Sequence, residues 1–82
     1  MIKLNEILKS YPDEEFIKAD GFDDAVVGIE VNSLRLVYSI ELAVESLMRK
    51  NIERDDALEH LYYKVIPEQV GEKSPIWINI LF

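Results

Sequence analysis

Three acidic side chains surround a glycine in the first third of the chain. The resulting acidic turn comprises Asp20, Gly21, Phe22, Asp23 and Asp24. Carboxylate oxygens are ligands for Ca²⁺ and Mg²⁺, but the EF-hand spacing is absent and a hard cation needs further ligands from elsewhere. The alternative is structural, because Asp20 or Asp23 can bond backbone amides in the turn while Gly21 supplies the backbone freedom. We therefore predict no metal and no cofactor.

Two further groups could in principle do chemistry. His60, the single histidine, lies one helical turn after Asp56, so an acid–imidazole pair is geometrically feasible. No serine or cysteine beside it is marked as a nucleophile, and it lies off the apolar stripe of its helix, which favours a solvated surface histidine. The loop Gly71–Pro75 lacks the Gly-x-x-x-x-Gly-Lys pattern of phosphate-binding loops and precedes a strand, which favours a turn. We predict no catalytic residues and no enzyme.

Length and composition limit the elements that could position these groups. The 82 residues leave room for one domain, spanning 1–82, with an N-terminal helical segment at 1–20 and an α+β core at 21–82. A hydrophobic fraction of 49% with 30% charged residues is ordinary for a folded protein. Cysteine is absent, which excludes disulfides, thiolate metal sites and a cysteine nucleophile.

The charge balance is strongly acidic. Nine basic against 16 acidic residues give a net charge of −7, and most of the negative charge precedes residue 32. Binding to a phosphate backbone needs clustered Lys and Arg, so we expect no direct nucleic-acid binding. A basic partner, or mimicry of nucleic acid toward a host protein that binds it, is consistent with this charge, and the alternative is that the charge serves solubility.

The N-terminus lacks the apolar stretch of a signal peptide, and no run approaches the roughly 20 apolar residues of a membrane span. We therefore expect a cytoplasmic protein without membrane contact.

The first residues predict two short helices. Leu4, Ile7, Leu8 and Tyr11 recur at helical spacing and Pro12 stops this helix. Pro12 also suits the first turn of a second helix, with acidic residues 13–15 at its positive end and a glycine at 21 to close it.

A hairpin follows, with strands at about 24–31 and 34–38. Apolar residues alternate along both strands, and Asn32-Ser33 forms a two-residue loop. This register pairs Val31 with Leu34, Ile29 with Leu36 and Val27 with Tyr38 on one face, and Glu30 with Arg35 and Gly28 with Val37 on the other.

Two antiparallel helices and a last strand complete the predicted fold. Ser39 is a good N-cap for a helix at about 40–50, Asn51 can end it in left-handed geometry, and a second helix covers about 54–66. The alternation at 76–82 predicts a strand that joins the hairpin in a small antiparallel three-stranded sheet. The fold class is therefore α+β, with the helices packed together and onto the sheet.

Several short motifs carry a family resemblance. They are Gly21-Phe22-Asp23-Asp24-Ala25 with Gly28, then Tyr38, Met48, Asp55-Asp56-Ala57 and Gly71-Glu72-Lys73-Ser74-Pro75-Ile76-Trp77. In this order they resemble a family of short, uncharacterised proteins encoded mainly by bacteriophages and prophages, over residues 20–78. The chain departs from the family pattern at Lys64, where the family has asparagine, and at Pro67-Glu68, where it has Gly-Ala. The resemblance implies a phage accessory context, in the host-cell cytoplasm, and nothing catalytic.

The second face of the predicted sheet is the candidate partner-binding surface. It comprises Val26, Gly28, Arg35, Val37, Trp77, Asn79 and Leu81, beside Glu30. Trp and Arg are enriched at binding hot spots, and exposed apolar patches mark interaction sites. The alternative is that the N-terminal helices cover this face and Trp77 packs over Gly28.

Three functions follow from these residues. We expect first a non-enzymatic accessory protein that binds a host or phage protein through the sheet face or the acidic turn. A free edge strand or the sheet face also offers a route to a homodimer. The alternatives are an acidic nucleic-acid mimic, and a small metal-dependent enzyme with a pocket of Asp20, Asp23, Asp24 and Glu72.

Overall fold

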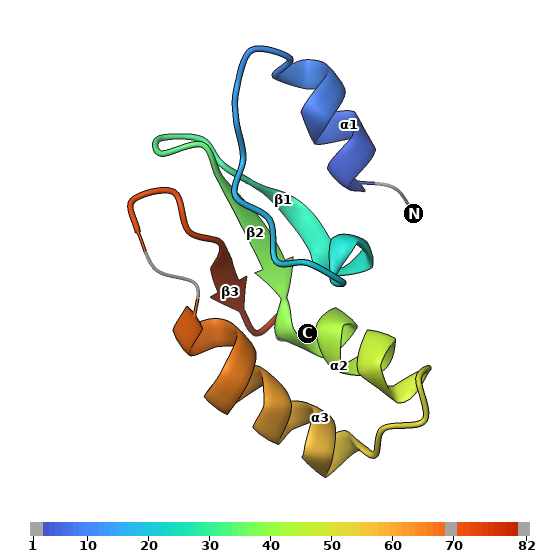
Figure 1. Ribbon diagram of the computed structural model, residues 1–82. Coiled ribbons are helices and arrows are strands. Elements are labelled where there is room, and N and C mark those ends of the chain that lie inside the picture. Colours follow the sequence, from blue (N-terminus) through green and yellow to red (C-terminus); the bar gives the residue numbers. More distant parts are fainter. Residues whose placement is uncertain (1–2, 69–70, 81–82) are drawn as a thin grey trace.

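The computed structural model describes residues 3–68 and 71–80, and over these residues it confirms the α+β fold class (Figure 1). A mixed sheet contains three strands in the order β1-β2-β3. The strands are β1 (Val26–Glu30), β2 (Arg35–Ser39) and β3 (Ile76–Ile78), and the α-helices are α1 (Lys3–Ser10), α2 (Ile40–Met48) and α3 (Arg54–His60). Shorter helical turns are η1 (Asp23–Ala25), the π-helical η2 (Leu61–Val65) and η3 (Ile66–Glu68).

The direction of the last strand differs from the prediction. β1 and β2 are antiparallel as expected, but β3 pairs with β2 in parallel, so the prediction of an antiparallel sheet is wrong on this point. A parallel neighbour needs a crossover of a dozen or more residues. The chain between Ser39 and Ile76 supplies it through α2 and α3, and then returns to the end at which β2 begins.

The hairpin register is confirmed at three of the predicted pairs. Glu30 lies opposite Arg35, Ile29 opposite Leu36, and Gly28 opposite Val37. The predicted pair of Val27 with Tyr38 is wrong, because a β-bulge between residues 26 and 28 places Val26 opposite Tyr38. A bulge adds one residue to one strand, so the side chains before it change faces. The predicted pair of Val31 with Leu34 is also wrong, because both residues lie in the turn.

The hairpin turn is longer than predicted. Residues 31–34 form the turn, and Leu34 has a positive φ of 56°. The Leu34 amide donates to the Glu30 carbonyl over 2.7 Å. The Glu30 carboxylate accepts from the amides of Asn32 (2.8 Å) and Ser33 (2.9 Å). The side chain of Glu30 therefore stabilises the turn, a role that simple alternation does not reveal.

The N-terminal segment forms one of its two predicted helices. α1 is present and buries Leu4 and Ile7. The second helix, expected after Pro12, is absent, and residues 14–19 run without regular secondary structure. Isolated short helices are marginal in water, so tertiary contacts decide such a segment. Here one such contact is the amide of Ala19, which donates to the buried hydroxyl oxygen of Tyr38 over 2.9 Å.

The central helices begin as predicted. The hydroxyl of Ser39 accepts from the amide of Leu42 over 3.2 Å, which confirms the N-cap. Asn51 has the expected left-handed geometry, with a φ of 67°, and α2 and α3 pack against each other.

The predicted helix at 54–66 is α-helical only as far as His60 and then widens. In η2 the amide of Ile66 bonds the carbonyl of Leu61, five residues back. Within η2, Leu61 is buried whereas Tyr62 is 46% exposed.

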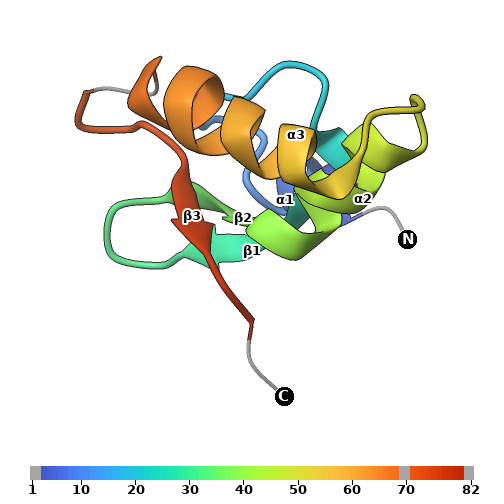
Figure 2. The same ribbon diagram turned by 90° about the horizontal axis from the view of Figure 1, so that it is seen from below.

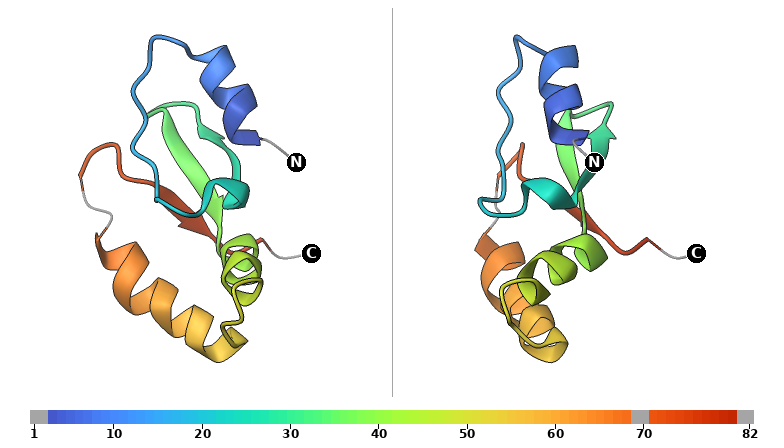
Figure 3. Two further views of the ribbon diagram at one scale, coloured as in Figure 1. Left: turned by 45° about the vertical axis from the view of Figure 1, so that its right-hand side comes forward. Right: turned by 90° about the vertical axis from the view of Figure 1, so that its right-hand side faces the viewer.

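The helices lie mainly on one side of the sheet. In Figure 2, α3 and the chain that follows α1 lie above the strands, α1 is partly hidden behind α2, and α2 continues from the end of β2. α1 contacts β1. The side chains of Val26, Leu36 and Tyr38 face this layer and are at most 2% exposed. The opposite side of the sheet carries no described helix (Figure 3). The sheet is therefore covered on one face.

Candidate functional site

Trp77 lies on the covered face of the sheet. It is in register with Tyr38, whose side chain is fully buried. The two rings stack with centroids 4.9 Å apart, and Phe22 meets Trp77 edge-on at 5.9 Å. Its Nε1 is buried without a hydrogen-bond partner among the described residues. The expectation that Trp77 shares a face with Gly28 and Val37 is therefore wrong, and Trp77 belongs to the core side.

A row of small and apolar residues crosses the other face. The register places Gly28, Val37 and Ile76 side by side on the three strands, and Ile78 follows on β3. Val37 alternates with the buried Leu36 and Tyr38 along β2, so it faces the opposite side of the sheet, as do its neighbours in the row. They are half-buried although no described helix lies over them. We call this surface the open face, and it consists of Gly28, Glu30, Arg35, Val37, Ile76 and Ile78.

Gly28 leaves open space at the β1 end of this row. A Cβ atom built at Gly28 would have no heavy atom within 4 Å, and its φ lies outside the left-handed region. The expectation that Gly28 makes room for Trp77 is therefore wrong. The space above Gly28 is open to solvent.

The two charged residues of the open face are held by neighbours. Arg35 donates from Nε to the carbonyl oxygen of Ser74 over 2.7 Å and from Nη2 to its hydroxyl over 3.4 Å. Hydrogen bonds from the amide of Asn32, and then from the hydroxyl and amide of Ser33, lower the pKa of Glu30 below its ordinary value of 4.5. These bonds fix the positions of both charges beside the apolar row.

The other predicted members of the partner-binding surface lie elsewhere. Val26 is 2% exposed and faces the core because the bulge at Val27 changes its side. Asn79 is exposed just beyond the end of β3, and Leu81 lies outside the described residues. Ile76 and Ile78 take the positions expected of Trp77 and Asn79. The alternation of residues 76–80 contains this signal, but the choice between its two faces needs the register with β2.

The acidic turn is mainly structural in its centre and exposed at its edges. Phe22 is buried, and its carbonyl accepts from the amide of Ala25 over 2.9 Å to form η1. Gly21 has a φ of 88°, as the turn requires. Asp20, Asp23 and Asp24 are exposed, and the hydrogen bonds of the turn join backbone groups. Among residues 3–68 and 71–80, the predicted side-chain bonds of Asp20 or Asp23 are not formed.

The carboxylates of this turn do not converge. Asp20 lines a shallow hollow of about 260 Å³ together with His60 and Glu68, whereas Asp24 lines a different one of about 440 Å³ with Arg49. Oδ2 of Asp24 lies 3.7 Å from Nη2 of Arg49, and both side chains are well exposed. Among residues 3–68 and 71–80, no three acidic or histidine side chains are grouped to hold a metal ion.

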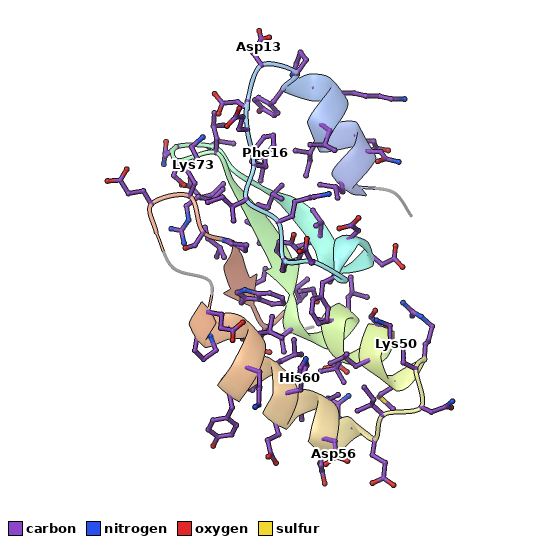
Figure 4. The ribbon with its side chains drawn as sticks, in the orientation of Figure 1. Asp13, Phe16, Lys50, Asp56, His60 and Lys73 are labelled. Atoms are coloured by element: carbon purple, nitrogen blue, oxygen red, sulfur yellow. The ribbon has the colours of Figure 1, made fainter. Side chains whose placement is uncertain are left out.

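Two further ion pairs join distant elements. Lys73 contacts Glu14 at 2.8 Å, which connects the loop before β3 to the chain after α1 (Figure 4). Arg54 donates to both carboxylate oxygens of Glu41 at 2.8 and 2.9 Å, which joins the starts of α3 and α2. The Arg54 bonds lower the pKa of Glu41 and raise that of Arg54. Neither pair lies on the open face.

Comparison with family models, curated proteins and solved structures found no match. The phage-family resemblance therefore stays a prediction carried by the motifs themselves. Of the helices in the described part of the chain, none has the length and apolar character needed to span a bilayer.

Proposed function

We propose that this protein is a non-enzymatic interaction domain that binds another protein through its open face. The observation that carries the proposal is the row Gly28, Val37 and Ile76, which is apolar and has no described helix over it. A sheet normally buries at least one face and tolerates water on the other when that face is polar. Here the uncovered face is apolar at its centre, which is typical of an interaction surface.

The surroundings of this row also support binding. Arg35 is anchored at the rim by Ser74, so less conformational entropy is lost when a partner contacts its guanidinium. Arginine is also enriched at interaction hot spots. The family resemblance supports a phage or host protein in the host-cell cytoplasm as the partner. The acidic mimic and the metal-dependent enzyme stay predictions, and no contact among the described residues favours either.

The test compares two variants that differ only in location. Val37→Glu places a charge at the centre of the open face, whereas Val31→Glu places the same charge on the hairpin turn, where Val31 is 71% exposed. Tagged proteins are used for quantitative capture from host and phage-infected lysates, after equal melting temperatures have been verified. We expect one or more proteins to be captured by the wild type and by Val31→Glu and lost with Val37→Glu.

Two results would contradict the proposal. One is a set of captured proteins that Val37→Glu retains in full. The other is a wild-type solution mass that is dimeric at micromolar concentration and becomes monomeric in Val37→Glu, because the open face would then be an interface between copies of this chain.

A further inference from the structure

The chain between α1 and the acidic turn crosses the covered side of the sheet without regular secondary structure. We call residues 14–19 of this chain the strap, and Figure 2 shows it above the strands. Among residues 3–68 and 71–80, the backbone amides of residues 15–18 form no hydrogen bond with another protein group. Segments with few backbone hydrogen bonds open at the lowest free energies within a fold.

One polar contact holds each end of the strap. At its start, a carboxylate oxygen of Glu14 lies 2.8 Å from Nζ of Lys73, and at its end the Ala19 amide donates to the Tyr38 hydroxyl oxygen over 2.9 Å. The ion pair is partly exposed, whereas Ala19 and Tyr38 are buried. Between these two contacts, Phe16 is half-buried against the core. The strap is therefore held by residues distant in the sequence and not by bonds of its own.

Open space borders the strap along its whole length. Residues 14–17 line a shallow hollow of about 400 Å³ beside Lys73, and residues 18 and 19 line another of about 260 Å³ beside His60 and Glu68. The side chain of Ile17 is 46% exposed. Because its packing is incomplete, the strap loses fewer contacts on leaving the surface than a core helix or strand would.

We propose that the strap opens as a unit while the sheet, α2 and α3 stay folded, and that the Glu14–Lys73 ion pair and the Ala19–Tyr38 hydrogen bond hold it closed. Opening breaks both contacts and gives water access to the Ala19 amide and the Tyr38 hydroxyl. The open face lies on the opposite side of the sheet, so opening of the strap is independent of the proposed function.

Native-state hydrogen exchange of the full chain, followed by NMR, tests this opening. The Ala19 amide reports the strap, and the amide of Val44, a residue of α2 that is 0% exposed, reports global unfolding. Exchange is measured for the wild type and for three variants. Lys73→Met removes the ion pair, Lys50→Met is its matched control at an exposed lysine beyond the end of α2, and Ala57→Gly weakens the interior of α3.

In the wild type we expect Ala19 to exchange about tenfold faster than Val44 after correction for intrinsic rates, with a weaker dependence on urea because local opening exposes little surface. Lys73→Met should speed exchange at Ala19 about two- to fivefold, the factor that corresponds to a partly exposed ion pair, and Lys50→Met should leave it unchanged. Ala57→Gly should speed exchange at Val44 about fivefold, because glycine destabilises a helix interior. It should leave Ala19 unchanged, because α3 stays folded when the strap opens.

Two results would overturn the inference. If Ala57→Gly accelerated exchange at Ala19 as much as at Val44, or if both amides exchanged equally in the wild type, the strap would be released only by global unfolding. Unchanged exchange at Ala19 in Lys73→Met, or the same acceleration in Lys50→Met, would show that the contact between Glu14 and Lys73 does not hold the strap.

Discussion

Removing one hydroxyl group from the core should measure what holds the chain after α1 in place. The Tyr38 side chain is fully buried, and its oxygen accepts a 2.9 Å hydrogen bond from the amide of Ala19, which is itself 1% exposed. Tyr38→Phe keeps the ring and its stacking on Trp77 but leaves the Ala19 amide without this acceptor. The substitution therefore isolates one hydrogen bond between residues that are distant in the sequence.

The size of the effect follows from the burial of both groups. Leaving a buried donor unsatisfied costs about 1–3 kcal/mol. For a domain of this size the free energy of unfolding is on the order of 4–12 kcal/mol, and each kcal/mol shifts the melting temperature by about 4–8 °C. Tyr38→Phe should therefore lower the melting temperature by at least about 4 °C.

Trp77 is the single tryptophan and packs against Tyr38, so its fluorescence reports unfolding of this core directly. Urea denaturation followed at Trp77 gives the free energy of unfolding of each variant. Tyr63→Phe serves as the control, because Tyr63 is 76% exposed and should lose almost nothing. A loss of less than about 0.5 kcal/mol in Tyr38→Phe would refute the reasoning, because the Ala19 amide would then be satisfied without the hydroxyl.

The burial of Tyr38 also predicts a difference at alkaline pH. Burial raises the pKa of Tyr38 above its ordinary value of 10.0, and the nearby Asp23 and Asp20 add to this while the Ala19 bond opposes it. The folded state therefore prefers the neutral phenol, and stability falls as pH rises above 10, where the unfolded chain ionises first. Stability of Tyr38→Phe should decline less over this range than that of the wild type. Equal declines would contradict the assignment.

Three further predictions concern other parts of the fold. Trp77→Ala should lower the free energy of unfolding by about 3 kcal/mol in circular dichroism, because it removes a large core side chain, and unchanged stability would contradict its place in the core. Because the folded-state pKa of Glu30 is lowered, its contribution is present above pH 4.5 and lost as pH falls through that lowered value, so Glu30→Gln should flatten the acid limb of the stability profile. Arg54→Met should lower the melting temperature at low salt by an amount that shrinks at about 1 M NaCl, and a difference independent of salt would show that Glu41 does not act through charge.

The candidate site was only partly predictable from sequence. Gly28, Arg35 and Val37 share one face of the sheet, as predicted. Alternation along each strand and the register of the hairpin determine this face, and the contacts that set them lie within a few residues of the turn. The predicted face of Trp77 is wrong because the alternation of Ile76 and Trp77 does not show which residue faces the core. Only pairing with β2 decides which side faces the helices. The predicted face of Val26 is wrong because one bulge residue reverses the alternation before it.

The features that the sequence determines by itself depend on interactions between residues close together in the chain. Ser39 caps α2 and Asn51 ends it because both act on backbone within a few residues, and the hairpin register follows from its own turn. Tertiary structure decided the parallel direction of β3, the loss of a helix after Pro12 and the covered side of the sheet. Each of these depends on contacts between residues far apart in the chain, such as Ala19 with Tyr38, whose energies exceed the weak preferences of a short segment.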